Sequence, residues 1–483
     1  MSKHLELLAV AAGRIASALA AIVGLYAMTR LLSVHEYTLL ALFTAFQSFA
    51  GLVLLNPAGH WLTRHVHEWH DSRALLHHHS LLNRFVGVGA ALTGLACGFW
   101  FVGVGHGTVT QAVAAGGALF VAVWFSTYAM SSAMVLNALG YRHVSVIWQI
   151  AMAWLPLGFS IVFAVQQPDA VTWLAGQAVG SGLASLVVRL GLTRLLREQT
   201  EKTPSAFYLD AAYWRYALPL AALTSMMWLY GNGYRFVLER AWDATTLGLF
   251  LLALSIPAQM TAVMESVVMQ YAYPYYFRRI AGSADVELQV EATSSMTNAL
   301  LPLYWVWGGF LCLAAPQVLY LIAAPQYHGA VQWLNAGTLL EVARLSANAW
   351  TLTAQARKDF RPLVVPAALG ALGSLAAAII TYRAGGSPWF FAGGLLLAAA
   401  LQSILSIHRA RGMLPIRLST KRAAFAGAVL LGALFLSFPL QTNRGVASSL
   451  AIILLAAGVT GWVAFQHLRS AVFFHALLRQ KLS

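Results

Sequence analysis

Charged residues are scarce in this sequence. Asp, Glu, Lys and Arg make up 10% of the 483 residues, and 59% of the residues are hydrophobic, whereas a soluble domain is usually about 25% charged. The apolar runs have the length of a helix that crosses a bilayer, about 20 residues. They lack the alternation of barrel strands, so helices are the expected spans. The composition therefore indicates an integral membrane protein.

Cysteine and the common catalytic motifs are almost absent. Cys97 and Cys312 are the only two cysteines, and each lies inside an apolar run. The sequence therefore indicates neither a disulfide framework nor a thiolate metal site. It contains no phosphate-binding P-loop, no GxSxG elbow and no HExxH pair. We expect no ATP-driven transport by this chain alone, no enzyme activity, and no cofactor or metal.

The apolar runs predict an all-α protein with about 14 transmembrane helices. The first run, from Ala9 to Leu31, is too long for a signal-peptide core and has no cleavage pattern, so we expect it to be retained. The predicted spans are residues 9–31, 38–60, 84–105, 109–137, 144–166, 170–192, 212–238, 246–270, 297–323, 331–354, 363–382, 388–408, 423–441 and 446–466.

Lys and Arg gather in alternate connections between these spans. Most of them lie on one side of the membrane if the amino terminus is cytoplasmic, and the positive-inside rule then places both termini in the cytoplasm. The net charge of +14 has the same origin. Because the basic residues are scattered and not gathered on one domain, we expect no nucleic-acid binding.

The longer connections lie on the predicted cytoplasmic side. The first, from Arg64 to Arg84, contains six histidines between His65 and His79. Paired imidazoles can chelate a transition metal, but three adjacent histidines do not share one helical face, which favours an interfacial helix or loop. The segment from Thr193 to Arg215 is the longest polar one and is the expected linker between two halves. The external connections are short and leave little room for catalytic groups.

Several ionisable residues lie inside predicted spans, where a charge costs several kcal/mol unless it faces a partner or water. Arg14 either reaches the inner headgroups or lines a cavity. Glu265 has apolar neighbours on both sides, and such a carboxylate either carries a proton or is hydrogen-bonded near the inner interface. Glu341 and Arg344 are three residues apart, so they form either a structural pair or a proton-sensitive gate.

A segment that contains an arginine occurs in two related forms. Residues 30–43 read RLLSVHEYTLLALF, and residues 240–250 read RAWDATTLGLF. In both, seven residues separate the Arg from a small residue, Thr38 or Gly248, which begins a new apolar run. Related halves are typical of transporters.

The end of the seventh span carries a second group of charges. Arg235 and Glu239 are four residues apart, so a structural ion pair competes with a phosphate-binding site. Arg240 follows them, and Arg30 has the corresponding position in the first half. Arginines at the outer membrane face are disfavoured by topology, and this favours a role facing the cavity for Arg30 and Arg240.

The repeated segments also carry a family resemblance. Residues 24–43 resemble the start of bacterial polysaccharide-export flippases, the O-antigen and exopolysaccharide translocases of the multidrug/oligosaccharidyl-lipid/polysaccharide exporter (MOP) superfamily. The matching residues there are Arg30, Leu31, Leu32, Ser33, Glu36 and Tyr37, with Thr38 in place of the usual Gly. In residues 217–250 the matches are Pro219, Arg235 and Gly248, and Tyr234 stands where Asp is common.

The resemblance implies two pseudo-symmetric six-helix lobes with two further helices. The lobes would be residues 1–192 and 212–408, joined by a cytoplasmic linker at 193–211, and residues 409–483 would hold the two added spans and a cytoplasmic tail. It also implies a monomer in the bacterial inner membrane that moves undecaprenyl-pyrophosphate-linked oligosaccharides between leaflets by alternating access. Its partners would be membrane lipids and the polymerase and other proteins of polysaccharide assembly.

Such a substrate would need a wet cationic path and a bias from a proton or ion. The candidates for substrate binding are Arg14, Arg30, Arg189, Arg235, Arg240 and Arg344. Those for ion coupling are Glu265 and Glu341. The alternatives are a multidrug or cation antiporter or a lipid II flippase of the same superfamily, and then a membrane glycan polymerase or ligase, which would need a large external loop.

Overall fold

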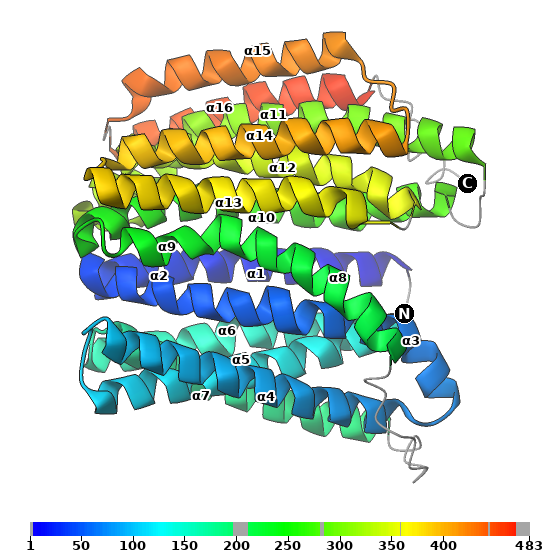
Figure 1. Ribbon diagram of the computed structural model, residues 1–483, viewed down its shortest axis with the longest axis vertical. Coiled ribbons are helices and arrows are strands. Elements are labelled where there is room, and N and C mark those ends of the chain that lie inside the picture. The colour runs from blue at the N-terminus through cyan, green and yellow to red at the C-terminus, as the bar shows by residue number, and fades with distance from the viewer. Residues whose placement is uncertain (1–2, 197–210, 281–284, 358, 443–444, 470–483) are drawn as a thin grey trace. The chain divides into compact units, whose positions relative to one another are not determined.

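The computed structural model describes residues 3–196, 211–280, 285–357, 359–442 and 445–469. These residues form helices joined by short turns, and no strand occurs among them (Figure 1). The all-α prediction is therefore confirmed. The chain divides into two compact units, Met1–Trp228 and Leu229–Ser483, called here the amino-terminal and carboxy-terminal units.

The amino-terminal unit contains eight α-helices and one π-helical segment among its described residues. The π-helical segment, η1, joins α2 to α3 without a break in the chain direction. The elements are α1 (Lys3–Leu31), α2 (Val34–Phe49), η1 (Ala50–Leu55), α3 (Asn56–Asp71), α4 (Leu75–Gly103), α5 (Val109–Ala138), α6 (Arg142–Gln166), α7 (Ala170–Leu195) and α8 (Ala211–Trp228).

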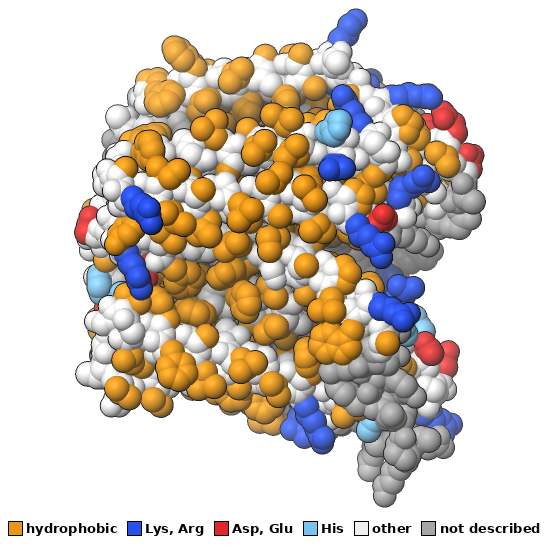
Figure 2. Space-filling model, in the orientation of Figure 1, with side chains coloured by type: hydrophobic (Ala, Val, Ile, Leu, Met, Phe, Trp, Pro, Cys, Tyr) orange, Lys and Arg blue, Asp and Glu red, His pale blue; other side chains and the backbone are white. Residues whose placement is uncertain are grey.

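The carboxy-terminal unit begins with a second π-helical segment. Its elements are η3 (Leu229–Gly233), α9 (Tyr234–Leu238), α10 (Ala244–Ile280), α11 (Val286–Ile322), η4 (Pro325–Trp333), α12 (Leu334–Arg357), α13 (Arg361–Ala384), α14 (Pro388–Met413), α15 (Thr420–Ser437), η5 (Phe438–Leu440) and α16 (Val446–Arg469). In this unit Figure 2 shows hydrophobic side chains over the middle of the helices and Lys and Arg toward their ends.

Each predicted span coincides with a helix or a run of consecutive helices. Eleven of these are long and apolar enough to cross a membrane within the described part of the chain, and Ile15–Leu31 is a shorter apolar helix. The protein is therefore a multi-pass membrane protein. Helix α12 does not reach the same apolarity, because it carries Glu341, Arg344 and several amide side chains.

Two helices of the carboxy-terminal unit are longer than predicted. Helices α10 and α11 each contain 37 residues, so each is about 56 Å long at 1.5 Å per residue. The hydrocarbon core is about 30 Å thick, so both helices project beyond it. Arg279 of α10 and Glu291 of α11 form an ion pair of 2.6 Å in the projecting part, which holds the two helices together there.

Small residues allow close helix packing in the amino-terminal unit. A Cβ at Gly176 of α7 would lie 2.5 Å from the carbonyl oxygen of Phe159 in α6, and one at Gly180 would lie 2.5 Å from that of Leu155. Any larger residue would push the helices apart. This is the small-residue packing that membrane helices use in place of a hydrophobic driving force.

Helices α15 and α16 are held on the carboxy-terminal unit by buried polar contacts. The Nε2 of the fully buried Gln317 in α11 donates to the carbonyl of Leu440 at 2.7 Å. The Oγ of Ser449 in α16 donates to Oε1 of the same Gln317 at 2.8 Å. Asn335 of α12 donates to Ser437 of α15 at 2.8 Å. Such bonds are costly to break inside a membrane protein, so this hairpin is a fixed part of the unit.

Candidate functional site

A network of charged side chains lies in the carboxy-terminal unit, between α10 and α12. Arg344 of α12 contacts two carboxylates, Glu341 on its own helix and Glu265 on α10. Asn348 of α12 completes the group through a hydrogen bond to Glu265. Glu341, Arg344 and Asn348 are three and four residues apart, so the helical repeat places them on one face.

The guanidinium of Arg344 is fully engaged with the two carboxylates. Its Nε and Nη2 donate to Oε2 of Glu341 at 3.0 and 2.7 Å. Its Nη2 and Nη1 donate to the two oxygens of Glu265 at 2.8 and 3.3 Å, and Nδ2 of Asn348 donates to the same carboxylate at 3.2 Å. A two-pronged contact of this kind fixes the orientation of both groups as well as their separation.

The network carries an excess of negative charge and is only partly shielded. It joins two carboxylates to one guanidinium, so its net charge is −1 when both carboxylates are ionised. The side chains of Arg344, Glu265 and Glu341 are 35%, 24% and 13% exposed. A proton or another cation that reached the network would neutralise this excess.

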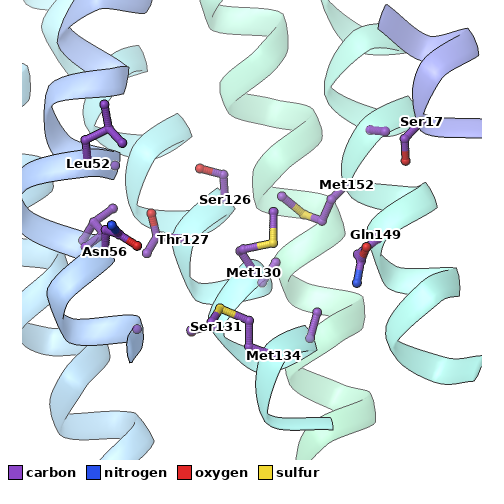
Figure 3. Close-up of a pocket in the computed structure, with 16 residues that line it drawn as sticks. Ser17, Leu52, Asn56, Ser126, Thr127, Met130, Ser131, Met134, Gln149 and Met152 are labelled. Atoms are coloured by element: carbon purple, nitrogen blue, oxygen red, sulfur yellow. The ribbon is translucent and has the colours of Figure 1, made fainter. Parts of the chain in front are cut away.

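A pocket of about 640 Å³ lies in the amino-terminal unit (Figure 3). It is bordered by α1, by the run from η1 to α3, and by α5 and α6. The described lining residues include no Asp, Glu, Lys or Arg, and consist of small, leucine, methionine and uncharged polar side chains. The polar ones are Ser17, Asn56, Ser126, Thr127, Ser131 and Gln149.

The π-helical segment η1 helps to form this pocket. Gly51, Leu52 and Leu55 of η1 all line it, and no heavy atom lies within 4 Å of a Cβ placed on Gly51. A π-bulge widens a helix locally and often marks a functional site. Met130, Met134 and Met152 line the opposite side, and such flexible side chains adapt to ligands of different shape.

Solved transporter structures align with the fold of this protein over most of the chain. The lipid II flippase MurJ, in an inward closed conformation, aligns with a TM-score of 0.58 and 11% identity over 96% of this chain and 100% of its own. An inward-facing multidrug resistance MATE family transporter of the MOP superfamily aligns with a TM-score of 0.54 and 16% identity over 86% and 96%. The eukaryotic MATE transporter AtDTX14 gives 0.53 and 13% over 88% and 98%.

The chain has the fold of these solved transporters. No protein-family model matches its sequence, and no curated protein matches it either. The neighbours with this fold are transporters and flippases and not enzymes. This fold is the one that the resemblance in residues 24–43 implies, while the O-antigen and exopolysaccharide branch of the MOP superfamily stays a prediction.

Among the described hydrogen bonds and ion pairs of the network, none involves the other predicted arginines. Arg30 is exposed at the end of α1, where its guanidinium lies 5.3 Å from the ring centre of Tyr26. Arg189 of α7 is exposed, and so is Arg240 after α9, whereas Arg235 of α9 is half-buried. The side chain of Arg14 lies outside the described residues. Their proposed role in binding substrate stays a prediction.

Three of the histidines at the end of α3 and the start of α4 pack on aromatic rings. His65 and His78 both stack on Trp69, with ring centres 5.4 and 4.3 Å apart. Nε2 of the buried His79 lies 3.1 Å from Oγ of Ser131. Within the described ranges, no three His, Cys, Asp or Glu side chains are grouped as metal ligands would be. The segment is the end of one helix and the start of the next.

Sequence reasoning singled out the three charged residues of the network, but neither Asn348 nor the pocket. The spacing of Glu341 and Arg344 predicts their pairing, and the structure contains it. The third member, Glu265, lies 79 residues from Arg344 in the chain, so no local pattern links the two. In the sequence, only the small and polar residues around Asn56 and Ser126 point to the pocket. The same residues are equally typical of ordinary helix packing.

Proposed function

We propose that this protein is a flippase that moves undecaprenyl-pyrophosphate-linked oligosaccharide repeat units from the inner to the outer leaflet of the bacterial inner membrane. The observation that carries the proposal is the MOP fold, which covers almost the whole chain and the whole of a lipid II flippase. The motifs in residues 24–43 and 217–250 support the polysaccharide branch. Both termini would lie in the cytoplasm, as the distribution of Lys and Arg favours.

The uncharged pocket of the amino-terminal unit supports a sugar-bearing substrate. Moving sugars through hydrocarbon is costly unless their hydroxyl groups find hydrogen-bond partners. Hydroxyl and amide side chains such as Thr127, Asn56 and Gln149 provide donors and acceptors without any charge. The volume of about 640 Å³ lies within the usual range for small-molecule sites, so the pocket would hold part of a repeat unit.

The charged network of the carboxy-terminal unit supports coupling to a proton or other cation. Two carboxylates already balance the charge of Arg344, so it has little attraction left for a phosphate. We therefore propose that Arg344 positions Glu265 and Glu341. The phosphate-binding role then passes to the remaining arginines, Arg14, Arg30, Arg189, Arg235 and Arg240. Protonation of one carboxylate would weaken its bond to Arg344 and shift the balance between inward-open and outward-open states.

A cation antiporter is the second candidate function. The excess carboxylate of the network favours it, since such a site attracts cations. Against it stands the pocket, whose described lining includes neither an acidic nor an aromatic side chain for a cationic drug. A lipid II flippase would differ from the first proposal only in the glycan carried.

The test is to delete the gene in a host that makes a surface polysaccharide and to label lipid-linked repeat units leaflet by leaflet. We expect the repeat units to accumulate in the inner leaflet, and the wild-type chain to release them. Arg344→Lys keeps the charge but loses the planar two-pronged contact, and should restore less than a tenth of the wild-type rate.

The matched control is Arg417→Lys, because Arg417 also pairs with a glutamate, Glu287, but lies at an exposed position. It should restore export fully. Normal surface glycan in the deletion strain together with raised sensitivity to cationic drugs would move the assignment to an antiporter.

A further inference from the structure

A second pocket lies in the carboxy-terminal unit, between the start of α15 and the end of α16. Its volume is about 400 Å³, and it is separate from the network of Glu265, Glu341 and Arg344. Its lining residues are Lys421, Arg422, Phe425, Trp462, Val463, Gln466 and His467. Neither the motifs nor the proposed transport cycle uses any of them.

The lining is arranged in two layers. Lys421 and Arg422 lie in the first turn of α15, and Phe425 lies one turn further along that helix. On the antiparallel α16, Gln466 belongs to the polar end and Trp462 lies one turn deeper. One turn of four residues is about 6 Å, so a polar, basic layer covers an aromatic layer on both helices.

The helices that carry the basic layer contain no acidic side chain. No Asp or Glu follows Asp359 in the sequence, so α13 to α16 are entirely without acidic residues. The carboxylate of Glu287 in the neighbouring α11 pairs with Arg417 at 2.8 Å. Two cations in the first turn of a helix are also disfavoured by the helix dipole. An anion in the pocket would offset the effect of the dipole and would interact favourably with Lys421 and Arg422.

The polar end of the pocket is held in place by the connection before α15. The backbone N–H of Ser419 donates to Oδ1 of Asn298 in α11 at 2.7 Å, and Nδ2 of Asn298 donates to the carbonyl of Arg417 at 2.7 Å. The N–H of Arg417 donates to Ser294 at 3.0 Å. These bonds fix the first turn of α15 on α11, so the backbone that carries Lys421 and Arg422 is held in place.

The aromatic layer is open toward the surface of two membrane-spanning helices. The side chain of Trp462 is 63% exposed and that of Phe425 is 59% exposed. Aromatic side chains with this exposure contact lipid chains in a membrane protein, and Trp favours the level of the headgroups. A soluble anion would use only the basic layer of the pocket, whereas a lipid would use both.

We propose that this pocket binds one anionic phospholipid, with its phosphate on Lys421 and Arg422 and an acyl chain against Phe425 and Trp462. Basic pockets between transmembrane helices are known to take acidic lipid headgroups. The bound lipid would link the start of α15 to the end of α16. The buried contacts of Gln317 hold the opposite ends of these two helices. The proposal concerns lipid binding alone and does not depend on what the protein transports.

The experiment titrates the purified full chain in detergent with dioleoyl phosphatidylglycerol, dioleoyl phosphatidylcholine or inorganic phosphate, and counts bound lipid by native mass spectrometry. We expect one phosphatidylglycerol to bind ahead of phosphatidylcholine and to stay bound in millimolar phosphate. Lys421→Gln with Arg422→Gln should weaken this binding about 30-fold, since each basic residue near an anionic lipid contributes about 1 kcal/mol. Phe425→Ser should weaken it several-fold.

The matched control is Arg409→Gln with Arg411→Gln, which removes the same charge from exposed positions near the end of α14, outside the pocket. An equal loss in this control would show general attraction to anionic lipid and would overturn the proposal. Equal binding of phosphatidylcholine, or displacement of the lipid by inorganic phosphate, would overturn it as well. Unchanged melting temperatures of the variants in detergent would establish that they are folded.

Discussion

The two units of the chain handle polar groups inside a membrane in different ways. The pocket of the amino-terminal unit distributes hydroxyl and amide groups around a cavity that has no charge in its described lining. The carboxy-terminal unit gathers two carboxylates and one guanidinium into a single network. The neutral groups of the pocket can donate and accept hydrogen bonds, whereas the network holds two carboxylates against one guanidinium. We infer a division into a binding unit and a coupling unit.

The largest expected effect comes from removing the positive member of the network. Arg344→Gln leaves Glu265 and Glu341 facing each other without a counter-charge. Breaking a buried pair costs 3 to 5 kcal/mol, and because Arg344 is 35% exposed we expect about 3 kcal/mol. Chemical unfolding in detergent measures the loss. A variant as stable as wild type would show that the network does not stabilise the folded protein.

The second prediction separates coupling from stability. Glu341→Gln keeps an acceptor for Arg344 but leaves one carboxylate against one guanidinium, so the network becomes neutral. We expect little change in unfolding and a transport rate that no longer varies with pH. Flux measured in proteoliposomes at several pH values checks this. If the variant keeps the pH profile of wild type, the coupling group is elsewhere.

The third prediction probes the amino-terminal unit. Thr127→Trp fills part of the pocket, which has room for the ring, so it should lower transport about 10-fold with unfolding changed by less than about 1 kcal/mol. Thr127→Ser keeps the hydroxyl and serves as the matched control, with transport near the wild-type rate. Equal activity of the two variants would show that the substrate does not pass through the pocket.

The smallest expected effect compares one aspartate from each unit. Asp169 precedes α7 and accepts the backbone N–H of Thr172 at 2.7 Å, and Asp243 precedes α10 and accepts both the N–H and the hydroxyl of Thr246, at 3.0 and 2.6 Å. Loss of a helix cap costs about 1 kcal/mol. We expect Asp243→Ala to lower the melting temperature slightly more than Asp169→Ala does, because two bonds are lost.

The pH dependence of this cap has a definite sign. Hydrogen bonds from the hydroxyl and then the backbone of Thr246 hold the pKa of Asp243 below its ordinary value of 3.8. Its stabilisation is therefore present above that value and is lost as the pH falls through the lower, folded-state pKa. The stability difference between wild type and Asp243→Ala should vanish in acid. A difference that persisted there would contradict this assignment.

The sequence predicts the helices well because, in lipid, a helix is the structure in which one segment satisfies all its own backbone hydrogen bonds. Every apolar run of membrane length coincides with a helix, since unpaired backbone groups are too costly there. Helices α10 and α11 extend beyond their predicted spans, because charged residues such as Arg279 and Glu291 interrupt the apolar runs in the projecting ends. Apolarity locates a span but does not report where its helix ends.

The site was less predictable because it depends on contacts between helices. The pairing of Glu341 with Arg344 follows from helical spacing, but the approach of Glu265 depends on how α10 packs on α12. Close packing at Gly337, where a Cβ would lie 2.5 Å from the carbonyl oxygen of Ala253, brings these helices together. The pocket is formed by residues of several helices that are distant in the sequence, so a pattern along the sequence does not predict it.

Translocation in proteoliposomes tests the central claim most directly. The purified chain would be reconstituted with a fluorescent undecaprenyl-pyrophosphate-linked oligosaccharide, and a membrane-impermeant reagent would report how much substrate reaches the outer leaflet. The account predicts rapid translocation by wild type, with Thr127→Trp slower by about 10-fold, Arg344→Lys slower by more than about 10-fold, and Arg417→Lys unaffected. No translocation by wild type, together with proton-driven uptake of a cationic dye by the same vesicles, would contradict it.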